Sequence, residues 1–427
     1  MAPLWDNFRG KDILITGGSG FVGTAILYRL LTRAPDVGRI YIICRGGLSA
    51  IERKWEAWLG VNAQVLLAAS NITVLEGDIE KMDFDTDLVA LKSEVNIIIH
   101  LASTINLARP LKQIKNMIVR ASMNLAEFGT KCDKLERFVY VSTAYANAHL
   151  HQQEKSGDVR VEEEIYPFTG FTTAEEWKEL LNYDEPLKFK ECIEQFPYAY
   201  AYAKHFTERL LLEKLGSRLL IVRPSIIGPA QSFPFEGYAV PLSTPSTMFS
   251  AAIMMTPSRD MVLATRLSSP MAEGTSDEVP VDVVADRLLA HLAFGTTGAI
   301  HAVAGSRART IFGDWFNACL RERRLPWKVK PVWKHIDWHS PELHPISRTT
   351  VIFGTSFDFA EGKTTELWST LEDEERMDWQ LFAEERGSHY DLSQRRKQIR
   401  FCVQKIAKRS RRARLLVNVF YRDYGVE

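Results

Sequence analysis

The chain has 427 residues, of which 46% are hydrophobic and 25% charged, and its 53 basic residues balance its 53 acidic residues. This composition is typical of a globular chain long enough for one large domain and an appendage. It excludes collagen-like, repetitive and disordered proteins, and it gives no reason to expect a nucleic-acid partner.

Short runs of β-branched and other apolar residues recur along the first half of the chain. They predict strands at residues 12–16, 40–44, 72–75, 96–101, 138–142 and 219–223. Each run is apolar throughout, as in strands that are covered on both faces. Helical patterns such as TAILYRLLTR, at residues 24–33, separate the runs. The alternation predicts an α/β fold, a Rossmann-type doubly wound parallel sheet with right-handed crossovers.

Two segments interrupt this alternation. Residues 151–199 are acidic and aromatic, and residues 229–280 are rich in Pro, Ser and Met. We expect both to be substrate-binding insertions above the carboxyl ends of the strands, where open α/β sheets bind ligands. A Rossmann domain is therefore expected over residues 1–300. A mostly helical C-terminal region with a basic tail is expected over residues 301–427.

Residues 16–23 read TGGSGFVG, between the first predicted strand and the first predicted helix. Gly17, Gly20 and Gly23 have the spacing of a dinucleotide-binding turn, in which glycine allows a positive φ and close approach of the backbone to a pyrophosphate. The helix N-terminus then faces the phosphates with unpaired N–H groups. An ordinary tight turn is the alternative, which the flanking strand and helix disfavour.

The end of the second strand indicates which cofactor is bound. An NAD enzyme usually has a carboxylate there, whereas this chain has Arg45, whose guanidinium suits a 2′-phosphate. We therefore expect NADPH, with a solvated loop arginine as the alternative. Asp78 is a candidate partner of the adenine amino group, or a cap. The expected cofactor contacts are Gly17, Ser19, Gly20, Phe21, Val22, Gly23, Arg45, Asp78, Ile79, Ala102, Tyr200, Lys204 and Pro224.

The segment YAYAK contains a tyrosine and a lysine, Tyr200 and Lys204, at helical i,i+4 spacing. A tyrosine that exchanges a proton near neutral pH needs its pKa lowered by about three units, and a nearby ammonium can supply about 4 kcal/mol of this. An aromatic helix stripe with a surface lysine is the alternative for an isolated motif. The dinucleotide turn favours the catalytic interpretation.

A hydroxyl at the end of strand 138–142 completes the expected site. Thr143 is the first choice and Ser142 the second, to donate to a substrate carbonyl oxygen as it gains negative charge. The alternative for Thr143 is an ST-turn or a helix cap. His100 closes a buried strand, so we expect it to be structural.

Together these segments resemble the fatty acyl-CoA reductases of the male-sterility type. They also resemble the thioester reductase domains of carboxylic acid reductases and nonribosomal peptide synthetases. Both groups of reductases are extended short-chain dehydrogenases/reductases. The resemblance covers residues 10 to about 290, and its motifs are TGGSGFVG, IIIHLAST, FVYVSTAYAN, VEEEIYP, YAYAKHFTERLL, IVRPSIIGP and VPVDVVADRLLA. It implies a catalytic triad of Thr143, Tyr200 and Lys204. One difference is Ile118, where such reductases usually have asparagine; this places turnover in doubt more than cofactor binding.

The resemblance implies NADPH-dependent reduction of an acyl thioester, on CoA or a carrier protein, to an aldehyde or primary alcohol. The alternative enzyme would reduce a free aldehyde, ketone or sterol-like alcohol. A nucleotide-sensing or scaffold protein is the non-enzyme alternative. The sequence does not indicate an oligomeric state.

Residues 394–427 carry a net charge of +9, with cations and apolar residues alternating at helical spacing. This pattern predicts a helix on an anionic membrane, a solvated face, or a dock for an acidic carrier protein. Five scattered cysteines without C-x-x-C spacing indicate neither a disulfide framework nor a zinc site. The N-terminus has no secretory-signal pattern. We therefore expect a cytoplasmic protein, either free or peripheral to a membrane.

Overall fold

The computed structural model describes residues 3–84, 88–152, 157–167, 170–184, 186–385, 392–408 and 411–422. Its centre is an eight-stranded sheet of order β13-β8-β6-β5-β1-β2-β3-β4. Seven strands are parallel, and the short edge strand β4 pairs antiparallel with β3. The strands are β1 (Ile13–Thr16), β2 (Ile40–Cys44), β3 (Ile72–Asp78), β4 (Asp83–Phe84), β5 (Ile97–His100), β6 (Arg137–Val141), β8 (Leu219–Pro224) and β13 (Gly298–Ala302).

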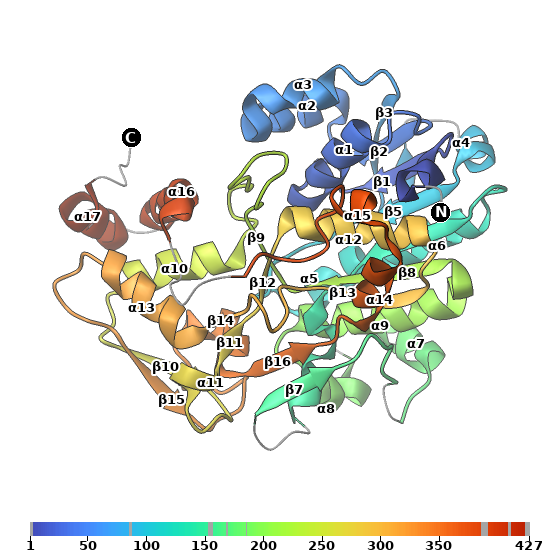
Figure 1. Ribbon diagram of the computed structural model, residues 1–427. Coiled ribbons are helices and arrows are strands. Elements are labelled where there is room, and N and C mark those ends of the chain that lie inside the picture. Colours follow the sequence, from blue (N-terminus) through green and yellow to red (C-terminus); the bar gives the residue numbers. More distant parts are fainter. Residues whose placement is uncertain are drawn as a thin grey trace.

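Helices cover both faces of this sheet, which confirms the doubly wound prediction (Figure 1). One face packs against α1 (Phe21–Arg33), α2 (Gly47–Leu59), α3 (Gln64–Leu67), α12 (Val281–Phe294) and α14 (Gly362–Thr370). The other packs against α4 (Leu88–Glu94), α6 (Ala121–Thr130) and α9 (Ala199–Leu215). Branched aliphatic side chains such as Ile13, Ile42 and Ile99 are fully buried between these layers. All six predicted strands form; β4 and β13 were not predicted.

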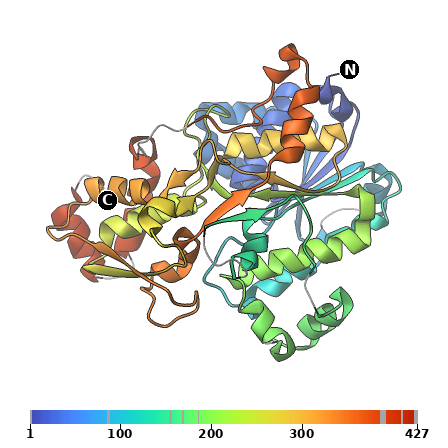
Figure 2. The same ribbon diagram turned by 60° about the horizontal axis from the view of Figure 1, so that its bottom comes forward.

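A second lobe lies beside the sheet, with its own hydrophobic core (Figure 2). Its helices are α10 (Pro245–Met255), α11 (Pro270–Glu273), α13 (Phe312–Glu322), α16 (Arg396–Lys408) and α17 (Arg411–Phe420). Helices dominate after Ile300, as expected, but β14 (Thr310–Ile311), β15 (Lys330–Lys334) and β16 (Ser356–Phe359) are strands. They pair with β11 (Thr275–Ser276), β10 (Asp260–Ala264) and β7 (Asp158–Val161). The C-terminal region is therefore interleaved with the two insertions.

Shorter elements complete the chain. The helices are α5 (Leu111–Lys115), α7 (Thr173–Asn182), α8 (Lys190–Ile193) and α15 (Asp373–Arg376), and β9 (Ile226–Gly228) pairs with β12 (Glu278–Pro280). Helix α7 begins with a capping box, in which Thr172 accepts from the Glu175 N–H and the Glu175 carboxylate accepts from the Thr172 N–H. Within the described residues, every helix is too short or too polar to cross a lipid bilayer.

A buried ion pair connects α1 to α12. Arg29 Nε donates to Asp286 Oδ1 at 2.7 Å and its Nη2 donates to Oδ2 at 2.8 Å, and neither side chain reaches solvent appreciably. The Arg29 guanidinium also lies 4.6 Å from the Phe233 ring centre. Two parallel hydrogen bonds offset the desolvation of both charges, so loss of one partner leaves an uncompensated buried charge.

We predict that Asp286→Asn lowers the free energy of unfolding by about 3–5 kcal/mol, because the Arg29 charge loses its partner. The exposed pair of Arg160 and Asp358 gives a matched control, since Asp358→Asn should cost less than about 1 kcal/mol. Denaturant unfolding of the three proteins measures both values. Equal losses in the two variants would contradict the prediction.

Candidate active site

The glycine turn brings three segments of backbone into close contact. Gly17 has a φ of +77°, and a Cβ atom there would lie 2.8 Å from the Ala102 nitrogen. A Cβ atom on Gly23 would lie 2.3 Å from the Gly17 oxygen. Side chains at either position would therefore push the first helix away from the strand ends. Helix α1 begins directly after Gly20, so the positive end of its dipole lies at this turn.

Two cavities of about 360 Å³ each meet at the turn. Both are lined by Gly17 and Gly20 and by Leu101 and Ser103, which follow β5. They lie at the carboxyl ends of the neighbouring strands β1 and β5, on either side of which the chain continues in opposite directions across the sheet. This is the topological switch point at which doubly wound sheets bind nucleotides.

The first cavity contains the predicted adenosine contacts. Ser19, Arg45, Asp78, Ile79 and Ala102 all line it. Arg45 is exposed at its rim. One oxygen of Asp78 already accepts the Glu80 N–H at 2.9 Å, so Asp78 also closes a turn.

Several side chains of this cavity were not predicted, among them Lys54 and Trp58. Lys54, on α2, extends its Nζ to 3.2 Å from the Ser19 hydroxyl and adds a second cation to Arg45. Trp58, one helical turn further, adds an aromatic wall. Their signal in the sequence is weak, because only the packing of α2 over β2 and β3 turns them towards the cavity.

The second cavity contains the predicted catalytic residues. Ser142, Thr143, Tyr200 and Lys204 line it together with Phe21, Val22, Gly23 and Pro224. Thr143 and Tyr200, 57 positions apart in the numbering, therefore share one cavity. Side chains that were not predicted also line it, and they are mainly apolar or aromatic: Ile105, Leu107, Tyr145, Tyr198, Ile226 and Ile352.

Lys204 is almost completely buried beside this cavity. Its side chain is 2% exposed, and its Nζ donates to the Val141 carbonyl at 2.7 Å. The same Nζ lies 4.6 Å from the Tyr140 ring centre and 5.9 Å from that of Tyr200. Burial lowers the pKa of Lys204 to about 7, and the Glu208 charge opposes this shift.

Burial raises the pKa of the Tyr200 phenol above its ordinary value. The expectation that the Lys204 ammonium lowers this pKa therefore does not hold in the structure, because loss of water around the phenol dominates. The phenol keeps its proton at neutral pH. This protonation state suits a group that gives a proton to a substrate oxygen.

The two hydroxyls at the end of β6 are held differently. Thr143 Oγ1 is 3.4 Å from the Pro224 carbonyl and also 3.4 Å from the Tyr145 N–H, as in the ST-turn that was the alternative. Its hydroxyl nevertheless lines the cavity. The buried Ser142 hydroxyl has no hydrogen-bond partner within the described part of the chain. A polar ligand atom in the cavity would satisfy it.

His100 is structural, as predicted. Thr16 Oγ1 lies 2.7 Å from its Nδ1, and Ser122 Oγ lies 2.9 Å from its Nε2. The Ser122 hydroxyl donates to the Ile118 carbonyl at 2.5 Å, within the π-helix η3 (Asn116–Arg120). Burial lowers the pKa of His100 to about 3. The buried Ile118 side chain packs in the apolar core between η3 and α9.

Comparison with known proteins places this site in a family. The sequence profile described as "Male sterility protein" matches residues 15–288. The chain belongs to this family. It is 30% identical to fatty acyl-CoA reductase 1 of Xenopus laevis over 312 residues, which are 68% of this chain and 56% of that protein. It is 28% identical to fatty acyl-CoA reductase 2 of Homo sapiens over 365 residues, which are 82% of this chain and 67% of that protein.

The chain thus spans little more than half the length of the Xenopus relative. Among solved structures, its fold is similar to the terminal R domain from the myxalamid PKS-NRPS biosynthetic pathway, with a TM-score of 0.58 and 17% identity over 87% of this chain and 89% of that one. The reductase domain of the aureusimine biosynthetic cluster gives a TM-score of 0.53 at 14% identity, covering 92% and 89%. These similarities confirm the Rossmann-type fold.

The buried Lys204 predicts a pH-dependent stability. Below about pH 7 the Lys204 amine is charged in the folded and the unfolded state, and burying that charge lowers the stability of the folded state. This cost decreases as the pH rises and disappears above about pH 10, where the amine becomes neutral in both states. We expect Lys204→Met to raise the free energy of unfolding more at about pH 6 than at about pH 10, with a difference near 4 kcal/mol for a shift of about three units.

Denaturant unfolding of the two proteins at both pH values tests this. The hydrogen bond to Val141 is lost in the variant at either pH, so its contribution largely cancels from the comparison. A Lys204→Met effect of the same size at both pH values would contradict the prediction.

Proposed function

We propose that the chain is an NADPH-dependent oxidoreductase that reduces an acyl thioester, carried on CoA or on a carrier protein, to an aldehyde or a primary alcohol. The observation that carries the proposal is the meeting of Thr143, Tyr200 and Lys204 with the glycine turn in one cavity. Membership of the male sterility family and similarity to proteins named fatty acyl-CoA reductases support it.

The residues of the two cavities fit a dinucleotide. The glycine turn leaves a cradle that a Cβ atom would fill, and the unpartnered Ser142 hydroxyl offers a buried donor beside it. The first cavity would hold the adenosine half, with Arg45 and Lys54 at the 2′-phosphate and Asp78 near the adenine. The second would hold the nicotinamide half near Tyr200, Lys204 and Pro224. When bound, NADPH supplies the hydride.

The chain's own residues supply the remaining chemistry. The Thr143 and Tyr200 hydroxyls donate to the substrate carbonyl oxygen as negative charge develops on it, and Tyr200 then transfers its proton to that oxygen. The resulting hemithioacetal would lose its hydroxyl proton as its C–S bond breaks, which gives the aldehyde and the free thiol. Lys204 supports the proton transfer as a buried donor beside the phenol. The apolar walls formed by Ile105, Leu107, Ile226 and Ile352 would take the acyl group and exclude water.

We expect Tyr200→Phe to lower kcat for NADPH oxidation with acyl-CoA by about 10²- to 10⁴-fold, since it removes the proton donor. NADPH binding, followed by fluorescence, should change little. Tyr202→Phe is the matched control, because the Tyr202 hydroxyl donates to Glu176 in a buried contact outside the cavity. Full activity of the Tyr200→Phe variant would disprove the catalytic assignment.

The choice of cofactor depends on the two cations of the first cavity. We expect Arg45→Ala with Lys54→Ala to raise the Kd for NADPH by at least about 100-fold and that for NADH far less, because each of the two charge-assisted hydrogen bonds contributes about 1.5–3 kcal/mol. Arg53→Ala is the control, since Arg53 is exposed on the same helix and does not line the cavity. Titration calorimetry with both cofactors decides between them. Equal losses for NADPH and NADH would reject the 2′-phosphate site.

A further inference from the structure

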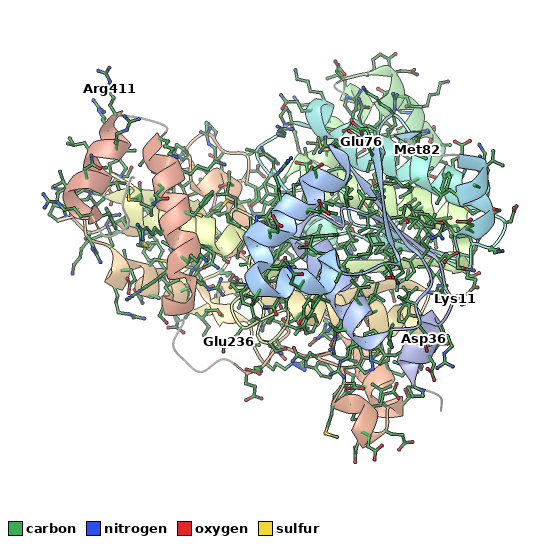
Figure 3. All side chains as sticks on the ribbon, turned by 90° about the horizontal axis from the view of Figure 1, so that it is seen from above. Lys11, Asp36, Glu76, Met82, Glu236 and Arg411 are labelled. Carbon is green, nitrogen blue, oxygen red and sulfur yellow. The ribbon has the colours of Figure 1, made fainter. Side chains whose placement is uncertain are left out.

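Helices α16 and α17 form the end of the second lobe, away from the central sheet (Figures 1 and 3). They pack against each other, and α16 packs along α10. Their inner sides join the core of the lobe through the buried residues Ile399, Cys402, Val403, Ala407 and Val417. The amphipathic helices predicted from the sequence therefore form, with their apolar sides already covered by protein.

Buried polar contacts fix the two helices to the lobe. Arg395, directly before α16, donates to Glu278 Oε1 at 2.5 Å, and the same oxygen accepts the Ser246 hydroxyl at 2.7 Å. Beyond α17, the buried Tyr421 hydroxyl donates to the Met254 carbonyl at 2.6 Å. These contacts anchor both ends of the pair, so its outward face has a defined orientation.

The outward face of α17 has apolar side chains between arginines. Leu415 and Val419 lie one turn apart, and they are 63% and 53% exposed. Arg411 and Arg412 precede Leu415 by one turn, and Arg422 follows Val419. All three arginines are exposed, and Arg411 points away from the protein in Figure 3.

Helix α16 repeats this arrangement. Phe401 is 41% exposed on the side opposite the buried residues. Lys397 and Lys405 lie one turn before and after it, and Lys408 lies two turns after it. These three lysines are exposed as well. Each helix thus presents apolar side chains surrounded by cations.

The charge of this face is unbalanced. Its exposed cations are Arg396, Lys397, Arg400, Lys405, Lys408, Arg411, Arg412, Arg414 and Arg422. Neither helix contains an acidic residue, and the one ion pair of these cations within the described residues is between Arg396 and Glu322, at 3.8 Å. The chain is neutral overall, so residues 1–393 carry −9 against the +9 of residues 394–427.

We propose that the outward face of α16 and α17 docks on the surface of an anionic phospholipid bilayer. Each lysine or arginine near such a surface gains energy from the lipid headgroups, while Phe401, Leu415 and Val419 enter the boundary with the acyl chains. The negative charge on the rest of the chain is repelled by the same surface, so one orientation is favoured. A second copy of the chain would meet this face with like charge.

Docking in this orientation places the lobe that lines the candidate active site against the lipid. Ser243 and Pro245, at the start of α10, line the second cavity, and α16 packs on the same helix. Membrane docking of the outward face of α16 and α17 does not depend on which reaction the active site carries out.

The test is co-sedimentation of the full chain with sucrose-loaded vesicles. Vesicles of phosphatidylcholine alone are compared with vesicles of phosphatidylcholine and phosphatidylglycerol in equal amounts. We expect binding to the mixed vesicles to be at least about tenfold tighter, and to be lost near 1 M salt, where the Debye length is about 3 Å.

Two double variants separate the charge from the apolar contribution. Arg411→Glu with Arg412→Glu should weaken binding to the mixed vesicles by at least about tenfold. Leu415→Ser with Val419→Ser should weaken it by about tenfold through lost apolar burial. All four positions are exposed, so the fold should be retained, which circular dichroism checks. Lys178→Glu with Lys214→Glu is the control, because these exposed lysines lie on α7 and α9 at the other end of the molecule.

The results decide the proposal either way. Equal binding to both kinds of vesicle, or no effect of the arginine variants, would overturn it. Concentration-dependent self-association that Arg411→Glu with Arg412→Glu abolishes would also overturn the proposal. Binding to an acidic carrier protein without binding to vesicles would overturn it too, if the same double variant abolishes that binding. In those cases the face belongs to a protein partner.

Discussion

The hydrogen bond between the Lys204 amine and the Val141 carbonyl holds the candidate site together. It joins the first turns of α9 to the end of β6, directly before the two hydroxyl residues Ser142 and Thr143. Because both groups are buried, an unmade bond would leave two polar groups without water. The contact places Lys204, one helical turn after Tyr200, beside the strand end that precedes Thr143. The site therefore depends on one lysine that is at once a structural anchor and a member of the proposed triad.

Much of the central domain could be predicted because its signals are local. Each strand of the parallel sheet is an uninterrupted apolar run, and the glycine turn has to lie between the first strand and the first helix. Tyr200 and Lys204 could be paired because i,i+4 spacing fixes their relation on any helix. The resemblance to the male sterility family, carried by the order of these motifs, anticipated the family that the comparisons show.

The remainder depends on contacts between distant parts of the chain. Strand β13 reads GAIHA, without the run of branched apolar residues of the predicted strands, and the strands of the second lobe find partners only after long intervals. Glu163, in the acidic motif VEEEIYP, accepts from the His301 and Lys363 backbone N–H groups and so ties an insertion to the C-terminal region. Burial, which the sequence does not give directly, decides the pKa of Tyr200. Lys54 reaches the first cavity only because α2 packs over β2 and β3.

The pairing of β7 with β16 has a consequence for how the protein is made. Ser356 lies opposite Asp158, so the ribosome must add 198 residues after one strand before its partner exists. Strands β1 to β6 emerge much earlier and can assemble around the glycine turn while synthesis continues. While these residues are added, the nascent chain therefore has an incomplete second lobe with its apolar interior open to water. Cellular chaperones that bind exposed apolar surface would meet this chain in that interval, which ends once β16 and the helices α16 and α17 have been synthesised.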